Sequence, residues 1–159
     1  MSLVIRRAEP RDVVDMLGLI VALAVYEREP DAVMATAESL GETLFGPNAQ
    51  VFAHVAELDG RVEGIALWFQ TYSTWTGRPS LYLEDLFVSD ALRGTGAGRA
   101  LFQALAREAK ARDCARIDWA VLDWNDSAKE FYSHIGARKS SGWEPWRIEG
   151  AALDALASA

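Results

Sequence analysis

Two carboxylates and a run of glycines lie close together in one short stretch of the chain. Residues 82–102 read YLEDLFVSDALRGTGAGRALF. Because neighbouring side chains of a strand point to opposite faces, Glu84 and Asp85 are expected on different sides of a sheet. A carboxylate buried there destabilises the fold unless it is paired or hydrated. Two interpretations stay open: one acid faces a solvated channel while the other pairs with an arginine, or Glu84 binds and helps to deprotonate an ammonium group.

The glycine-rich turn offers a second kind of chemistry. In residues 93–98 (RGTGAG), glycines permit positive φ and let a ligand approach the backbone closely. Backbone N–H groups at the start of the following helix can then bind phosphate or pyrophosphate. A P-loop is excluded because no Lys-Ser/Thr follows Gly98, and the dinucleotide fingerprint would need a glycine at position 99. What remains is Arg-x-x-Gly-x-Gly, with a tight strand-to-helix turn that binds nothing as the alternative.

Composition and charge exclude several other classes. The 159 residues suit one domain, and the formal net charge of −7 argues against nucleic-acid binding while it is compatible with a cationic substrate. The single cysteine, Cys114, allows no internal disulfide and has the setting of a small buried hydrophobe. His54 and His134 are isolated, so no metal site is expected. The apolar run 16–26 is too short to cross a bilayer and the N-terminal residues lack a signal-peptide pattern, so we expect a cytoplasmic protein without membrane contact.

The elements that must position these residues follow from the hydrophobic periodicity. Strands are expected over 3–7, 51–58, 61–72, 81–88, 115–122 and 146–148, and helices over 11–28, 35–45, 98–112, 125–134 and 151–157. Asp59-Gly60 predicts a two-residue hairpin turn, and Asn125 or Asp126 is expected to cap the fourth helix. The order βααβββαβαβ predicts a mixed α/β fold in a single domain, residues 1–159, with one right-handed βαβ crossover at the glycine turn.

A second motif lies downstream of the glycine turn. Residues 121–137 read VLDWNDSAKEFYSHIGA, and Asn125 and Tyr132 are seven residues apart, so they share a helix face. With the glycine turn, this segment resembles the N-x-x-A/S-x-x-F/Y-Y-x-x-x-G-F/A block of the GNAT superfamily of N-acetyltransferases. Within that superfamily the chain is most similar to the diamine (spermidine/spermine) and thialysine acetyltransferases. The stretches that carry this likeness are AVYE at 24–27, WTGRPSLYLEDLFVSDALRGTGAGR at 75–99, residues 121–137 and the Trp146-Arg147 pair.

The resemblance implies the GNAT fold, a central mixed and mostly antiparallel twisted sheet flanked by helices, with a βαβ core that binds acetyl-CoA as co-substrate. Tyr132 corresponds to the acid that protonates the leaving thiolate, and Glu84 to the acid that acts on the amine through water. A backbone N–H of Leu86 or Phe87 would stabilise the thioester oxygen, and direct transfer without an acetyl-enzyme is expected. The residues implied to bind the cofactor are Leu86, Phe87, Val88, Arg93, Gly94, Thr95, Gly96, Ala97, Gly98, Arg99, Asn125, Ser127 and Tyr132.

The resemblance also implies a small cationic amine as acceptor and a homodimer, often built through the last strand. Positions of the family's amine pocket hold Tyr26, Glu27, Trp75, Glu84, Asp85 and Glu144. The sequence departs from the diamine acetyltransferases at Trp143, where they carry a second acidic residue. This departure favours a shorter amine or a lysine analogue over long polyamines. Trp68, Trp119 and Trp124 are assigned to packing.

Two other functions fit the same motifs. An acetyltransferase of this superfamily could instead modify a protein N-terminus, a lysine side chain or an aminoglycoside, although the YLED strand and its aromatic loop favour a small-amine pocket. A non-catalytic acyl-CoA-binding sensor domain could use the same fold. The presence of Tyr132, Glu84 and the full glycine turn argues for catalysis.

Overall fold

The computed structural model describes residues 2–159, and internal packing divides the chain into two compact units, one up to Trp124 and one from Asn125 onwards. The first unit contains the strands β1 (Leu3–Arg7), β2 (Val51–Leu58), β3 (Arg61–Ser73), β4 (Arg78–Val88) and β5 (Ile117–Asp118). It also contains α1 (Val13–Tyr26), α2 (Ala37–Phe45), α3 (Ala97–Ala111) and the 3-10 turns η1 (Pro10–Asp12) and η2 (Asp90–Leu92). The second unit contains α4 (Asp126–His134) and α5 (Gly150–Ala157). The expectation of a single domain stays a prediction.

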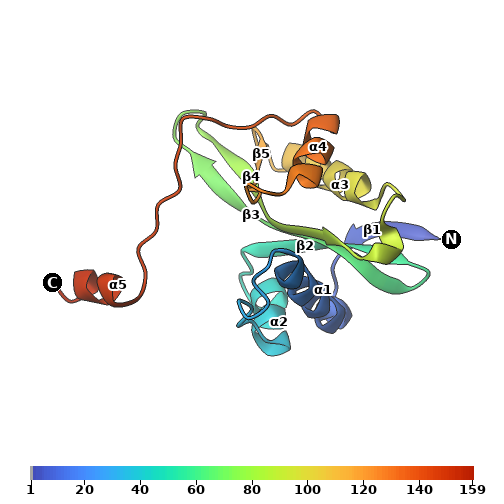
Figure 1. Ribbon diagram of the computed structural model, residues 1–159, viewed down its shortest axis with the longest axis horizontal. Helices are drawn as coiled ribbons and strands as arrows, with labels where there is room; N and C mark the ends of the chain where they lie inside the picture. Colours follow the sequence, from blue (N-terminus) through green and yellow to red (C-terminus); the bar gives the residue numbers. More distant parts are fainter. Residues whose placement is uncertain (1) are drawn as a thin grey trace. The chain divides into compact units, whose positions relative to one another are not determined.

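The five strands form one mixed, mostly antiparallel sheet in the order β1-β2-β3-β4-β5, as expected (Figure 1). β1 to β4 pair antiparallel in sequence, and β4 pairs with β5 in parallel. Asp59 and Gly60 join β2 to β3 with φ of 49° and 84°. Positive φ at both central residues is what a type I′ hairpin turn requires, so the predicted turn is confirmed. α3 supplies the crossover between the parallel strands.

Helices cover both faces of the sheet, with α1 and α2 on one face and α3 on the other (Figure 1). On the α1–α2 face, buried aliphatic side chains such as Met16, Leu40 and Ile65 form the main core. On the other face, α3 buries Leu101 and Leu105 completely. Because both faces are covered, the central strands are apolar on both sides rather than alternating apolar with polar residues.

The strand β5 is much shorter than the sequence suggests. The strand expected over 115–122 reduces to Ile117–Asp118, which pairs with β4 only at Leu81 and Tyr82. After Asp118 the chain leaves the sheet, and Trp119 packs on Phe102 of α3 with 5.0 Å between ring centroids. Among residues 2–159, β4 beyond Tyr82 therefore has β3 on one side and no strand on the other. The free edge of β4 leaves backbone groups available to a ligand.

Two further boundaries differ from the sequence-based expectation. β4 begins at Arg78 rather than residue 81, and the loop before it shrinks to a turn over 74–77. The strand expected over 146–148 is wrong, because residues 143–149 lie outside helix and strand and Trp146 is 90% exposed. A segment forms a strand only where a neighbouring strand satisfies its backbone groups, and a short sequence pattern does not reveal that neighbour. The last helix, α5, is present as expected.

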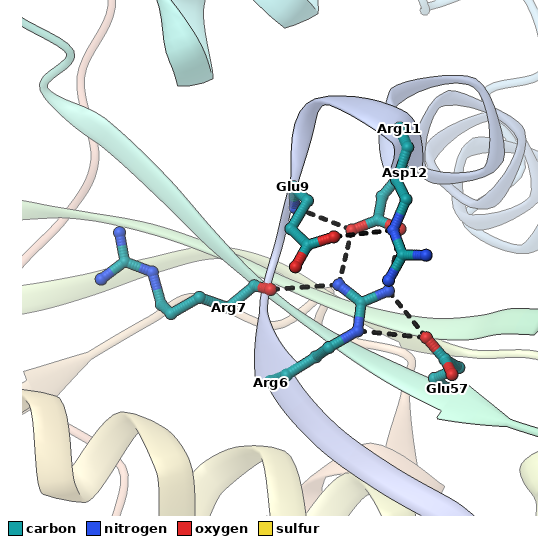
Figure 2. Close-up of polar contacts among 6 residues, drawn as sticks. All are labelled: Arg6, Arg7, Glu9, Arg11, Asp12 and Glu57. Carbon is teal, nitrogen blue, oxygen red and sulfur yellow. Dashed lines mark hydrogen bonds and ion pairs between the residues drawn. The ribbon is translucent and has the colours of Figure 1, made fainter. Parts of the chain in front are cut away.

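An ionic network joins β1 to β2 and to the start of α1 (Figure 2). Arg6 donates to both carboxylate oxygens of Asp12 at 2.8 and 2.9 Å, and to Glu57 at 2.7 and 3.1 Å. The backbone N–H of Glu9 donates to Asp12 at 2.7 Å. Burial by itself would raise the pKa of Asp12, but the hydrogen bonds from Arg6 and Glu9 and the charge of Arg6 lower it overall. Asp12 is thus a buried acid that is fully paired.

Candidate active site

The glycine turn leads from η2 into α3 in the conformation that its composition predicts. Gly94 and Gly96 have φ of 73° and 84°, in the left-handed region that favours glycine. The Thr95 hydroxyl donates to the carbonyl of Leu92 at 2.6 Å and accepts from the N–H of Ala97 at 3.4 Å, which holds the turn closed. The turn is therefore built by its own residues and does not need a ligand to keep its shape.

The backbone of the turn is open to an anion. A methyl group at Gly94 or Gly96 would meet nothing within 4 Å, so the space beside the turn is free. The N–H of Ala100 donates to the carbonyl of Gly96, so the N–H groups before Ala100 lie in the first turn of α3, which has no intrahelical partners for them. Arg93 is exposed and pairs with Asp90 at 2.8 Å. The N–H groups of Thr95 and Ala97 already donate within the turn, and its remaining N–H groups together with the positive end of the helix fit a pyrophosphate group.

The strand β4 bulges at Glu84, directly before the segment Leu86–Val88. Asp85 lies opposite Leu67 and Leu83 opposite Trp68, so Glu84 has no partner residue on β3. A bulge interrupts the strict alternation of side chains, so alternation alone does not assign Glu84 and Asp85 to opposite faces, and that assignment stays a prediction. Leu86–Val88 pair with β3 on one side, and their other side is the free edge of β4.

The acids of β4 lack a countercharge. Burial, followed by the negative charges of Glu84 and Glu27, raises the pKa of Asp85 to about 6. Burial also raises the pKa of Glu27, while Glu84 is exposed. Both charges that act on Asp85 are negative, so the interpretation in which an arginine pairs with it is wrong. Within residues 2–159, Glu27, Glu84 and Asp85 form no salt bridge, and an ammonium group would stabilise these three carboxylates.

The C-terminal end of α1 brings Tyr26 and Glu27 to this region. Tyr26 is the last residue of α1, and Glu27 follows it as the C-cap. The Tyr26 ring lies 6.1 Å from the Trp124 ring, and the Arg28 guanidinium lies over the Trp124 ring at 4.0 Å from its centroid. The sequence pattern assigns Trp124 to packing and gives no signal at Arg28. These residues are 96 positions apart, and no local pattern signals that they meet.

The structure does not bring Trp75 to the acids. Trp75 lies at the tip of the β3–β4 hairpin and is 86% exposed. From Arg78, where β4 begins, to Glu84 the strand advances six residues, which at about 3.3 Å per residue is about 20 Å. Tyr26, Glu27, Glu84 and Asp85 are therefore the predicted substrate residues that the first unit gathers, and Trp75 lies far from them along the hairpin.

The second unit holds the remaining predicted residues. Asn125 caps α4, because its side-chain oxygen accepts from the Ala128 N–H at 3.3 Å and from the Ser127 hydroxyl at 3.4 Å. Tyr132 is half-buried on α4, with its ring 5.7 Å from that of Phe131. Glu144 is exposed in the segment after α4. The capping role of Asn125 is confirmed, while the cofactor, catalytic and substrate roles in this unit stay predictions.

Three other features bear on the chemistry. Cys114 is 4% exposed and burial raises the pKa of its thiol, as befits the small buried hydrophobe expected from its sequence setting. Within the described residues 2–159, the His, Cys, Asp and Glu side chains form no group of three or more that could hold a metal ion. Over the same residues, every helix is too short or too polar to cross a membrane.

Comparison with known proteins places this site in a family. Residues 18–137 match the model of the acetyltransferase (GNAT) family. The thialysine N-epsilon-acetyltransferase of Sus scrofa is 36% identical to the chain over 98% of both proteins. A human spermidine/spermine N(1)-acetyltransferase-like protein 1 is 33% identical over 91% of this chain and 22% of its own length.

A solved structure agrees over the whole chain. An integron cassette protein from the mobile metagenome of V. cholerae superposes with a TM-score of 0.83 at 31% identity, covering 100% of this chain and 99% of the other. The mixed sheet and the glycine turn between β4 and α3 are the features expected of a GNAT protein, and the sequence matches identify the same family. The chain therefore belongs to the GNAT family of acetyltransferases.

Proposed function

We propose that this N-acetyltransferase transfers the acetyl group of acetyl-CoA to a primary amine of a small cationic substrate, by direct attack of the amine within a ternary complex. The observation that carries the proposal is the group of three carboxylates, Glu27, Glu84 and Asp85, which form no salt bridge within residues 2–159, while burial and the charges of the other two raise the pKa of Asp85. Glu84 and Asp85 lie on β4, eight or more residues before the glycine turn at 93–98, and Glu27 joins them from the end of α1. A cationic amine supplies the charge that this region lacks.

The residues proposed to bind acetyl-CoA are those of the glycine turn and of the free edge of β4. Acetyl-CoA is the acetyl donor of the family, and it supplies a thioester carbonyl next to an anionic diphosphate. The N–H groups of Gly94, Gly96, Gly98 and Arg99 would bind the diphosphate, because those of Thr95 and Ala97 already donate within the turn. The free edge of Leu86–Val88 would hold the pantetheine arm by backbone hydrogen bonds. A backbone N–H of Leu86 or Phe87 would donate to the carbonyl oxygen as charge develops there. Asn125 and Ser127 are further residues proposed to bind the cofactor.

The acceptor must lose a proton before it attacks. Alkyl ammonium groups have a pKa near about 10, so the amine arrives protonated at neutral pH. Glu84 and Asp85 orient it and accept its proton, directly or through water. The new C–N bond forms as the C–S bond breaks, and Tyr132 donates its hydroxyl proton to the leaving thiolate. A tyrosine suits this role because its pKa of about 10 keeps it protonated at neutral pH.

Direct transfer fits the surroundings of the single thiol. A covalent acetyl-enzyme would need an accessible nucleophile, and Cys114 is buried with a raised thiol pKa. Incubation with acetyl-CoA in the absence of amine should leave the protein mass unchanged. A stable acetyl adduct on the protein, detected by mass spectrometry, would contradict direct transfer.

The function is tested by measuring thiol release from acetyl-CoA with diamines, basic amino acids, an aminoglycoside and a lysine-containing peptide. Release with the small amines at the highest kcat/KM supports the proposal. Preference for the peptide or the aminoglycoside would contradict the substrate class. Acetyl-CoA binding without release for any amine would favour a sensor domain instead.

The role of Tyr132 is tested by Tyr132→Phe. Loss of a general acid should lower kcat by about 10²- to 10⁴-fold and leave acetyl-CoA affinity within a few-fold of its original value. Tyr72→Phe is the matched control, because Tyr72 is 68% exposed on β3. Near-normal turnover of Tyr132→Phe would remove this residue from the mechanism.

A homodimer is the proposed assembly. The segment that was expected to form a last strand leaves Trp143 and Trp146 75% and 90% exposed, and Ile148 50% exposed. Large apolar side chains at this exposure favour association with another chain. Light scattering should give twice the mass of the chain, and Trp146→Ser should lower that mass toward the monomer. The cytoplasmic location stays a prediction.

A further inference from the structure

Arg28 has a backbone conformation that arginine seldom adopts. At the end of α1 the N–H of Glu29 donates to the carbonyl of Ala24 at 2.9 Å, and the N–H of Arg28 to that of Val25 at 3.1 Å. This pair of bonds is a Schellman motif, whose left-handed position is usually a glycine. Arg28 holds that position with φ of 65°. A side chain retained where the backbone favours glycine is a reason to ask what the side chain does.

The side chain of Arg28 lies over the indole ring of Trp124. Its guanidinium is 4.0 Å from the centroid of the Trp124 ring, and the Tyr26 ring supports Trp124 at 6.1 Å. Stacking uses the face of the guanidinium and leaves the N–H groups along its edge. Within residues 2–159, no Asp or Glu forms a salt bridge with Arg28. The edge can therefore receive the carboxylate of a ligand through two parallel hydrogen bonds.

The charges of Arg28 and of the acids are kept separate. Arg28 directly follows Glu27, yet within residues 2–159 it forms no salt bridge with Glu27, Glu84 or Asp85, and its guanidinium lies over the Trp124 ring. The region has a negative part at the three acids and a positive part at Arg28. A polycation matches only the first part, whereas a molecule with one ammonium end and one carboxylate end matches both.

We propose that Arg28, held on Trp124, determines substrate specificity by binding a carboxylate of the acceptor, so that the enzyme selects basic amino acids over diamines and polyamines. This inference rests on the proposed function, because it concerns the same amine site. The side-chain ammonium of the amino acid is addressed by Glu84 and Asp85, and its carboxylate by Arg28. A diamine of the same length has no carboxylate, and a polyamine places a further ammonium group near the guanidinium, which repels it.

The test compares each amino acid with its own carboxamide. Ornithine, lysine and S-(2-aminoethyl)cysteine are each assayed beside the corresponding amide, which keeps both amines and loses only the negative charge. For the unmodified enzyme we expect kcat/KM to favour the acid over the amide by about 10- to 100-fold, the range of a charge-assisted bidentate contact. An acid-to-amide ratio near one would overturn the inference.

Three variants assign the preference to the side chain of residue 28. Arg28→Gly should bring the ratio close to one, and its fold should be intact with a melting temperature within about 3 °C, because glycine suits the left-handed position. Arg28→Glu should invert the ratio, so that the amide and the diamine become the better acceptors. Arg28→Lys should keep a reduced preference, because it retains the charge but not the planar pair of donors. An unchanged ratio in Arg28→Gly would contradict the proposal.

Binding of the same pairs to the enzyme–CoA complex, measured by calorimetry, separates this inference from the proposed function. If no amine is acetylated but the acid still binds more tightly than the amide in an Arg28-dependent way, the proposed function fails and the inference stands. If amines are acetylated and neither ratio depends on Arg28, the inference fails and the proposed function stands.

Discussion

Arg6 with its partners, and the acids of the candidate site, are two groups of charged side chains in the same unit of the fold. In the first group, Asp12 accepts three hydrogen bonds, and they hold its pKa below the ordinary value despite burial (Figure 2). In the second group, burial and the negative charges of Glu84 and Glu27 raise the pKa of Asp85 to about 6. Charges that hold secondary-structure elements together are paired within the chain. The carboxylates at the candidate site are unpaired, and this is where a cationic substrate gains the most.

The largest expected effect comes from breaking the paired group. Asp12→Asn leaves Arg6 without its buried partner and should lower the free energy of unfolding by about 3 kcal/mol, or about 6–12 °C in melting temperature, with kcat/KM little changed below the transition. Arg11→Gln is the control, because Arg11 pairs with Glu9 at the surface and its loss should cost less than about 1 kcal/mol. Equal losses in free energy of unfolding for the two variants would show that the buried pair of Asp12 stabilises the fold no more than a surface pair does.

Replacing the aspartate of the unpaired group by asparagine should raise, rather than lower, the free energy of unfolding. Asp85→Asn removes a carboxylate that the fold disfavours, and at pH 8 it should raise the free energy of unfolding by about 1–3 kcal/mol while kcat/KM falls. The folded-state pKa lies above the unfolded value of 3.8, so the gain is fully present above about pH 6. It disappears as the pH falls toward 3.8, where both states hold the proton. Denaturant unfolding at pH 8 and pH 4 checks this, and a loss of stability at pH 8 would contradict the comparison.

The charge of Glu84 should affect the pH dependence of activity, because it helps to raise the pKa of Asp85. If the amine needs ionised Asp85, kcat/KM should rise with an apparent ionisation near pH 6. Glu84→Gln removes one of the two charges that raise the pKa of Asp85, so the ionisation should move to lower pH while the maximum falls. The pH profile of kcat/KM is the measurement, and Glu63→Gln, on β3, is a control that should leave the midpoint in place.

The last prediction concerns His54, on the α3 face, whose effect is confined to acid pH. His54 is 5% exposed, its Nδ1 accepts from the Trp68 indole at 3.1 Å, and burial lowers its pKa to about 4. Because the folded-state pKa lies below the unfolded value, the free energy of unfolding should be constant above about pH 6.5 and fall as the pH drops toward 4. Between pH 6.5 and 4 the protonation of Asp85 should raise the free energy of unfolding and mask the effect of His54. The measurement is therefore made in the Asp85→Asn variant.

His54→Asn supplies the comparison for that measurement, since its amide oxygen can accept the Trp68 N–H without taking up a proton. The double variant should lose the decline between pH 6.5 and 4. An identical decline with and without His54 would place the acid sensitivity elsewhere.

Much of the fold could be predicted from local sequence. Hydrophobic periodicity predicted α1, α3 and the first strands, and Asp59-Gly60 predicted its hairpin, because these signals involve residues close together in the chain. Tyr26, Glu27 and the β4 acids could be named as one group only through the likeness to a family. Strand ends were harder, because a strand ends where its neighbour ends, and that neighbour is distant in sequence.

The sequence by itself determined the glycine turn, the presence of two acids beside it and the helix cap at Asn125, because each depends on the backbone preference of a few adjacent residues. Tertiary structure alone decided that β5 stops after two residues, that β4 bulges at Glu84 and that Arg28 meets Trp124. Each of these depends on pairing or packing between distant segments, where burial and charge are set by neighbours that no local pattern contains. The pKa of Asp85 belongs to the same class, because it is set by burial within the folded unit and by Glu27, 58 positions away, as well as by adjacent Glu84.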